Sequence, residues 1–285
     1  MSNYVRYTGE NNRGPSPIIF GDIAKCYHDQ WVGKCVVVYD DFQNVGVLAS
    51  AGASGSPYTY QDTSVTIKGS TALPALGSAG ALGEIRIVHD GTDADEGSFQ
   101  LGSGSGVFRL ETTAANAGKV MFECRVRKST IADNGLAFFA GLGTGDVATN
   151  YLVDSTGDLI ATKGFIGFQN LHDDGDHVDT LYQEISQTKA QVLANAATMV
   201  ANTFMKLGFI YDPGFPDDKK IKFFVDGVDT VTYVTKTQME AATFPQATSG
   251  LIPMFLTQIE TATAFEAGVD WICAVPQFEV VGLSG

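Results

Sequence analysis

Positive charge is scarce in this 285-residue sequence. Lysine and arginine together number 18 against 32 aspartates and glutamates, which gives a formal net charge of −14. Because an acidic surface repels phosphate backbones and anionic lipids, this balance argues against a nucleic-acid or membrane partner. The excess lies after residue 40, since residues 1–40 hold four basic and four acidic side chains. We therefore expect a neutral N-terminal segment followed by an acidic body.

Cysteines and long apolar runs are also few. The four cysteines, at positions 26, 35, 124 and 273, show no C-x-x-C or Cys/His spacing, so reduced thiols are the default expectation. No apolar run approaches the roughly 20 residues that a membrane helix needs. The opening "MSNYVRYTGENN" lacks a charged region followed by an apolar one, as an export signal has. The sequence predicts synthesis in the cytoplasm without Sec export.

Helical periodicity is rare, whereas turn residues and alternating strands are common. The chain has 32 glycines, and glycine supplies the positive φ that tight turns need. In "KVMFECRVRK", apolar Val120, Phe122, Cys124 and Val126 share one face and the charged residues 123, 125 and 127 share the other, which predicts a strand with one buried and one solvated face. About a dozen such segments without intervening amphipathic helices predict an all-β fold of two packed antiparallel sheets. Only "QTKAQVLANAATMVANTF" stays open between helix and strand.

The first forty residues are expected to form an extended arm, and residues 41–285 a single β-sandwich domain. Pro15 and Pro17 favour extended backbone and argue against a helix across them, and a strand is expected at residues 35–39. Apolar side chains on an arm without its own core need a surface to pack on, which is either the arm's own domain or a neighbouring subunit. The candidate partner-binding residues are Pro15, Pro17, Ile18, Ile19, Phe20, Tyr27 and Trp31.

No catalytic set is recognisable. A glycoside hydrolase needs two carboxylates roughly 5–9 Å apart, but the positions that share a strand face with Glu84 in "GEIRIVHD" are Arg86 and Val88. The segment nearest to a G-x-S-x-G motif, residues 102–106, is low-complexity "GSGSG", which has glycine at the central position and no strand-to-helix context. We therefore expect no catalytic residues and no enzymatic activity.

Two acidic loops have the composition of calcium sites. "HDGTDADEG" offers Asp90, Asp93 and Asp95, and "LHDDGDHVD" offers Asp173, Asp174 and Asp176. Calcium prefers six to eight oxygen ligands, but neither loop has the EF-hand spacing, and Asp-Gly turns are common between strands in any case. Zinc at the two histidines of the second loop lacks a third ligand. The two loops are thus candidate sites for structural calcium, and no cofactor is expected.

The order of motifs resembles a known family. "KLGFIYDPGFPDDKKIKFFVDGV", then "TFPQATSGLIPMF" and "VDWICAVPQF", is similar to the closing strands of concanavalin-A-like lectin/glucanase sandwiches. Upstream, "GPSPIIFGDI", "YDDF", "GEIRIVHDGTDADEGSFQLG" and "FECRVRKSTIADNGLAFFAGLG" complete a succession that resembles virion proteins of tailed bacteriophages.

The resemblance implies a concanavalin-A-like jelly-roll β-sandwich that is a non-enzymatic virion protein, made in the host cytoplasm. The first expectation is a capsid decoration protein that binds the major capsid protein and copies of itself through its N-terminal arm and sheet edges. The alternative is a lectin-like module of a tail or fibre that binds a surface glycan.

Overall fold

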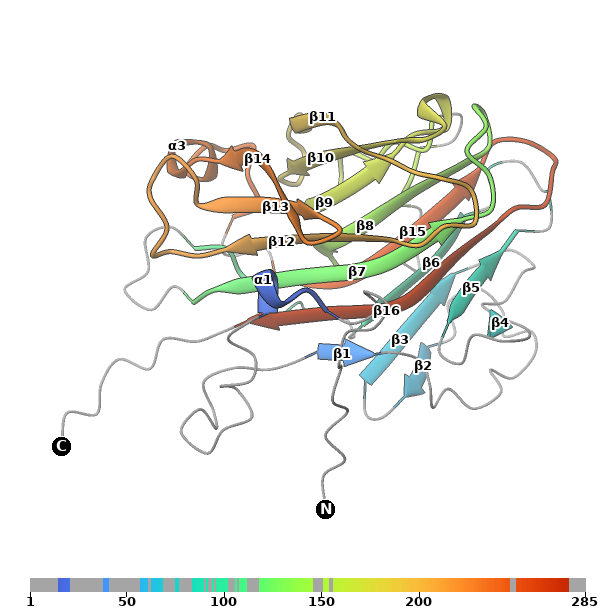
Figure 1. The fold of residues 1–285 in the computed structure, drawn as a ribbon, viewed down its shortest axis with the longest axis horizontal. Helices are drawn as coiled ribbons and strands as arrows, with labels where there is room; N and C mark the ends of the chain where they lie inside the picture. Colours follow the sequence, from blue (N-terminus) through green and yellow to red (C-terminus); the bar gives the residue numbers. More distant parts are fainter. Residues whose placement is uncertain are drawn as a thin grey trace, which may run out of the picture.

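The chain forms two eight-stranded antiparallel sheets that face each other (Figure 1). The computed structural model describes residues 15–20, 38–40, 57–60, 63–68, 75–76, 84–89, 91, 94, 96–101, 106, 108–111, 118–145, 151–153, 156–246 and 250–276. Among these residues, no helix has the length and apolar character needed to cross a membrane. The expected all-β sandwich of two antiparallel sheets is confirmed.

Sheet 1 has β7 and β16 at its centre. Its order is β14 (Val228–Val234), β13 (Ile221–Val225), β12 (Met205–Tyr211), β7 (Val120–Lys128), β16 (Glu266–Pro276), β5 (Ile85–Val88) and β4 (Ala75–Leu76), with β1 (Val38–Asp40) also paired to β16. The strand expected at residues 35–39 is thus present over its described part.

Sheet 2 has β8 and β15 at its centre. Its order is β11 (Ala190–Thr198), β10 (His177–Gln183), β9 (Phe165–Asn170), β8 (Leu136–Thr144), β15 (Leu251–Ile259), β6 (Glu96–Leu101), β3 (Thr63–Lys68) and β2 (Pro57–Tyr60). The segment left open between helix and strand is therefore β11, an edge strand.

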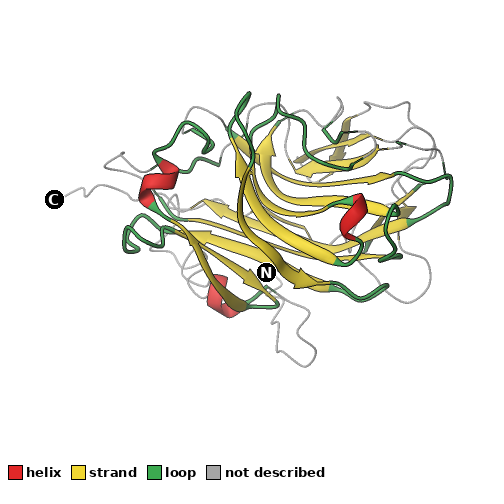
Figure 2. Ribbon diagram, turned by 90° about the horizontal axis from the view of Figure 1, so that it is seen from above, coloured by secondary structure: helices red, strands yellow, loops and turns green. Residues whose placement is uncertain are grey.

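Within the described residues, helical structure is confined to short turns at the periphery of the sheets (Figure 2). These are α1 (Pro17–Phe20), the 3₁₀ turn η2 (His172–Asp174) and α3 (Lys236–Met239). Thr235 caps α3 by accepting a hydrogen bond from the Gln238 amide, while the Gln238 side chain accepts one from the Thr235 amide. None of these turns is long enough to be a layer of the fold.

The space between the sheets is filled by the alternating apolar side chains that the sequence predicted. Phe122 on β7 stacks on Phe209 of β12 within sheet 1, and Phe168 of β9 meets Phe223 of β13 edge to face across the two sheets, with ring centroids 5.6 Å apart. Such aromatic pairs add roughly 0.5–1.5 kcal/mol each beyond the area they bury. The inward face of β7 matches the expectation, since Val120, Phe122, Cys124 and Val126 are all buried.

The hairpin between β13 and β14 follows directly from "VDGV". Asp226 and Gly227 both have positive φ, 50° and 77°, as the two central residues of a type I′ turn require. Val225 and Val228 pair on either side of them. This turn places Gly227 beside the N-terminal segment, where a Cβ on it would lie 3.0 Å from Ser16 Oγ.

Candidate functional site

The outer face of sheet 2 is covered by the chain's own loop between β8 and β9. Five outward-facing residues of β8, β9, β10 and β15 form an apolar cluster with three loop residues: Phe139, Phe165, Leu181, Met254 and Leu256 with Tyr151, Leu152 and Leu159. All eight are buried. The described part of the loop is therefore packed onto the sheet, and we call residues 151–153 and 156–164 the covering loop.

Glu96 fastens the start of the covering loop. It is a buried residue of β6, and its carboxylate accepts hydrogen bonds from the backbone amides of Tyr151, at 3.0 and 3.1 Å, and Leu152, at 3.0 Å. The Tyr151 hydroxyl in turn donates to the carbonyl of Thr144, at 3.0 Å. A carboxylate that accepts two amide hydrogen bonds is a strong anchor, because charge-assisted hydrogen bonds are stronger than neutral ones.

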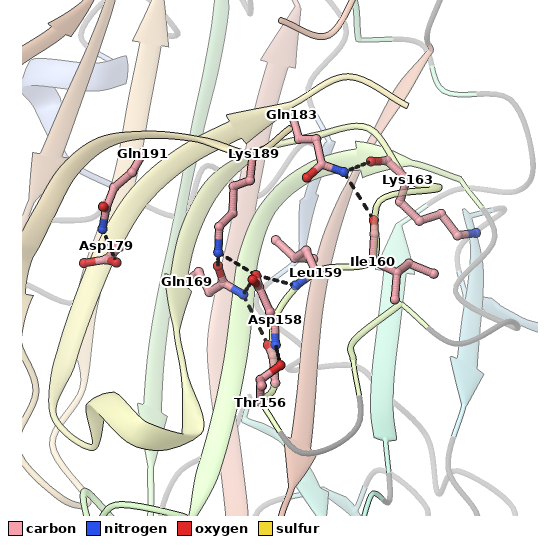
Figure 3. Close-up of polar contacts among 11 residues, drawn as sticks. Thr156, Asp158, Leu159, Ile160, Lys163, Gln169, Asp179, Gln183, Lys189 and Gln191 are labelled. Atoms are coloured by element: carbon pink, nitrogen blue, oxygen red, sulfur yellow. Dashed lines mark hydrogen bonds and ion pairs between the residues drawn. The ribbon is translucent and has the colours of Figure 1, made fainter. Parts of the chain in front are cut away.

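A polar cluster fastens the rest of the covering loop (Figure 3). Lys189 donates to Asp158 Oδ1 at 2.6 Å and to Gln169 Oε1 at 3.2 Å, and Gln169 Nε2 donates to Asp158 Oδ1 at 3.1 Å. Gln183 donates to the carbonyls of Ile160 and Lys163, at 3.3 and 3.1 Å. Gln169 lies on β9, Gln183 is the last residue of β10, and Lys189 directly precedes β11, so the cluster ties the loop to three neighbouring positions of the sheet.

The carboxylates on this face are engaged in holding the chain together. Glu96 binds the loop backbone, and Asp158 pairs with Lys189. Asp179 accepts hydrogen bonds from the Gln191 side chain, at 2.5 Å, and from the Asn195 amide, at 2.8 Å. These carboxylates therefore hold the covering loop and β11 in place. The Lys189 and Asp158 side chains are about a quarter and a third exposed, so solvent screens their ion pair.

The outer face of sheet 1 is covered in part by α1, which lies against β7 and β12 (Figure 1). Ile19 and Phe20 pack into an apolar cluster with residues of β7, β12, β13 and β16: Met121, Ile210, Phe224, Trp271, Cys273 and Val275. Gly208 permits this close approach, because a Cβ there would lie 2.7 Å from Ile19 Cδ1 and 2.8 Å from the Phe122 carbonyl oxygen. Trp271 is 2% exposed and belongs to this cluster, on the face of sheet 1 that carries α1.

A buried polar network holds the start of α1. The Ser16 amide donates to Glu123 Oε2 at 2.7 Å, and Lys206 Nζ donates to Ser16 Oγ at 2.8 Å. Burial raises the pKa of Glu123, against the lowering effects of its hydrogen bonds with Ser16 and of the Lys206 charge. The network joins three segments that are far apart in sequence, so docking of the N-terminal segment depends on specific polar contacts as well as on apolar packing.

The expectation of an extended arm is wrong at residues 17–20. Pro17 begins a helical turn, since the first helical position needs neither an amide hydrogen nor a φ that proline cannot adopt. Ile19 and Phe20 are buried against the chain's own sheet, so they are not available to a partner as predicted. Pro17 and Ile18 face outward, and Ile18 is 58% exposed. Pro15 is half-buried, and Tyr27 and Trp31 lie outside the described residues.

The charged face of β7 is not the solvated surface that alternation predicted. Arg127 pairs with Glu84 at 2.7 Å and with Glu266 at 2.9 Å, and Arg86 also pairs with Glu266 at 2.9 Å. Next to this ladder, Arg125 pairs with Asp270, and its guanidinium lies 4.3 Å from the Phe204 ring centroid. Acidic partners from neighbouring segments therefore pair with these cations.

The calcium candidates are not brought together where the structure describes them. Asp173 and Asp174 belong to η2, and Asp176 lies near His177, with 3.5 Å between its carboxylate and the ring Nδ1. Among the described residues there is no group of three or more His, Cys, Asp or Glu side chains that could hold a metal ion. Asp90, Asp93 and Asp95 lie outside the described residues.

Sequence reasoning missed the exposed end of the sandwich, where β11 and β14 meet. β14 exposes Val228 at 68% and Val231 at 75%, and Val200, just after β11, is also exposed. Val231 has φ +56°, a conformation that is strained for a β-branched residue. The available signal was charge, since residues 190–204 contain no charged side chain in a chain of net charge −14. We call this surface the β11/β14 end.

Both edge strands are interrupted by register shifts. The β10–β11 pairing shifts around Thr180, and the β13–β14 pairing shifts between Lys222 and Phe224. Bulges on edge strands hinder the addition of a further strand. A partner at the β11/β14 end would therefore contact side chains more readily than it would extend the sheet.

Comparison with solved structures agrees with this architecture. The carbohydrate recognition domain of Emp47p matches 86% of this chain and 98% of its own, with 13% identity and a TM-score of 0.50. SO2946 of Shewanella oneidensis MR-1, a protein of unknown function, matches 88% and 90% with 13% identity and a TM-score of 0.49. A Bacillus licheniformis β-glucanase matches 84% and 97% with 17% identity and a TM-score of 0.44.

No protein-family model matches the sequence, and no curated protein matches it. At these identities the structural likeness bears on the fold alone. The chain has the concanavalin-A-like lectin/glucanase fold.

Proposed function

We propose that this chain is a non-enzymatic structural protein of a tailed-bacteriophage particle, most specifically a capsid decoration protein. It binds the major capsid protein and copies of itself, and it resides in the virion after synthesis in the host cytoplasm. The order of motifs that resembles phage virion proteins supports the setting. The covering loop and α1 support a structural role, because they pack against the outer faces of the chain's own sheets and so stiffen the sandwich.

The observation that carries the proposal is that apolar side chains on the outer faces of both sheets are packed, whereas those at the β11/β14 end are exposed to solvent. The β11/β14 end exposes Val228 and Val231 on a scaffold whose other apolar clusters are packed. A rigid scaffold loses little conformational freedom on association, so a modest apolar contact repeated over many copies can suffice. At the same end, β11 carries no charged side chain, so it does not add to the electrostatic repulsion between copies of this acidic protein.

Particle binding tests the proposal directly. Particles that lack this protein would be mixed with the purified chain and sedimented, and bound copies counted by quantitative mass spectrometry. We expect the Val228→Lys/Val231→Lys variant to fold and to lose most binding. Ile131→Lys, a change at a partly exposed apolar residue outside β11 and β14, serves as the matched control and should bind normally. Unchanged occupancy of the double variant would exclude the β11/β14 end, and absence of the wild-type chain from purified particles would exclude the virion role.

Glycan binding is the competing outcome. A glycan array probed with the wild-type chain, with and without calcium, separates the two functions. Specific, saturable binding to one glycan class together with absence from heads would favour the lectin-like module of a tail or fibre, and blank arrays under both conditions would remove it.

A further inference from the structure

Lys128 is a buried lysine that bridges the two sheets. It is the last residue of β7 in sheet 1 and is 1% exposed. Its Nζ donates to the Leu136 carbonyl at 3.1 Å and to Asn170 Oδ1 at 2.5 Å. Asn170 is the last residue of β9 in sheet 2 and is equally buried. An amine and a carboxamide from opposite sheets are thus in direct contact inside the protein.

The contact is an unusual way to bury an ammonium group. None of the ion pairs within the described part of the chain includes Lys128, and Asp176 and Asp133 act on it only as more distant charges. Desolvation lowers the pKa of Lys128 to about 8. At pH 7 about a tenth of such a group is the neutral, nucleophilic amine, against far less for a solvated lysine.

The amide of Asn170 is held with its carbonyl toward Lys128. Its Nδ2 donates to the backbone carbonyls of Asp174, at 3.0 Å, and His177, at 2.6 Å, with Gly175 at 3.5 Å. Three carbonyls around the nitrogen fix which end of the amide is oxygen. The electrophilic carbon Cγ is therefore bonded to the oxygen that Lys128 Nζ contacts, so the amine lies beside the carbon that it would attack.

We propose that Lys128 and Asn170 form an intramolecular isopeptide bond that links the two sheets covalently. The neutral Nζ attacks Asn170 Cγ, so that an Nζ–Cγ bond forms and the Cγ–Nδ2 bond breaks. One proton passes from Nζ to Nδ2, which leaves as ammonia, and no oxidant or reductant is consumed.

Formation of the isopeptide bond would remove the buried positive charge of Lys128. The buried cation becomes a neutral secondary amide, so the desolvation of a charge is removed. The bond also joins residues 128 and 170 and restricts the unfolded chain, as a disulfide does. Neither consequence depends on the function proposed above.

Intact-mass spectrometry of the denatured wild-type protein tests the proposal. We expect a species lighter than the sequence mass by one ammonia, and a branched peptide joining Lys128 to Asn170 after proteolysis. The Asn134-Gly135 step can lose ammonia on its own by forming a succinimide, so the peptide identity decides between them. A wild-type mass equal to the sequence mass, or an ammonia loss mapped only to Asn134, overturns the proposal.

Two variants complete the test. Lys128→Arg retains a cation that cannot act as an amine nucleophile, and we expect it to restore the full sequence mass. Lys206→Arg is the matched control, because Lys206 is also buried but donates to the hydroxyl of Ser16, which offers no carboxamide carbon. It should keep the ammonia loss. Persistence of the loss in Lys128→Arg, or its disappearance in Lys206→Arg with the fold retained, contradicts the assignment. If Lys128→Arg does not fold, the wild-type mass and branched peptide still decide.

Discussion

Replacing Glu96 tests whether the covering loop is an anchored part of the fold. Its carboxylate accepts hydrogen bonds from two backbone amides, those of Tyr151 and Leu152, in a buried setting. Hydrogen bonds to a charged group contribute about 1.5–3 kcal/mol each, so Glu96→Ala should lower the free energy of unfolding by roughly 3–6 kcal/mol. Glu96→Gln keeps one acceptor oxygen without the charge and should lose roughly half as much.

Urea unfolding followed by tryptophan fluorescence measures the free energies, and hydrogen exchange reports the amides of Tyr151 and Leu152. We expect both amides to lose protection in Glu96→Ala. Glu240→Ala is the control, because Glu240 is exposed and its ion pair with Lys236 is long, at 3.9 Å. That change should stay within about 0.5 kcal/mol of the wild type. A loss below about 1 kcal/mol in Glu96→Ala, with both amides still protected, would refute the anchoring role.

Three further predictions concern the docked N-terminal segment. Gly208→Val should destabilise the protein by about 1–3 kcal/mol and expose α1 to proteolysis, because the new side chain meets Ile19 and the Phe122 carbonyl; unchanged proteolysis would contradict the close approach. Ile19→Ala should cost about 2–5 kcal/mol in urea unfolding, whereas Ile18→Ala, at an exposed position, should cost under about 0.5; equal losses would mean that α1 is not docked as described. Burial raises the pKa of Glu123, so the folded state binds more protons than the unfolded state between the ordinary and the raised value. The wild type should therefore gain stability relative to Glu123→Gln as the pH falls from 7 to 5, and the opposite slope would show that the Lys206 charge dominates.

The strands could be predicted from sequence because their signal is local. In "KVMFECRVRK" every second residue is apolar, and pleating alone places those residues on one face of β7. "VDGV" specifies its hairpin in the same way, since the turn type depends on the φ values that Asp and Gly tolerate. The fold class follows from the number of such segments and the lack of amphipathic helices between them.

The site could be predicted only in part. Pro17 has the same sequence signature whether it prevents a helix or begins one, and its position within the turn decides. Arg127 looked solvent-facing because alternation identifies a face but not what covers it, and its partners come from strands far along the chain. The exposed valines of β14 could not be separated from buried ones by their residue type.

The sequence by itself determined a two-sheet antiparallel sandwich, its turn chemistry and its acidic balance, because each depends on neighbours within a few residues. Only the tertiary structure decided that α1 and the covering loop each cover part of an outer face, that valines at the β11/β14 end stay exposed, and that Lys128 contacts Asn170. Those contacts join segments tens to hundreds of residues apart. They depend on how the sheets stack and on which edge each strand occupies, and neither is encoded in a local pattern.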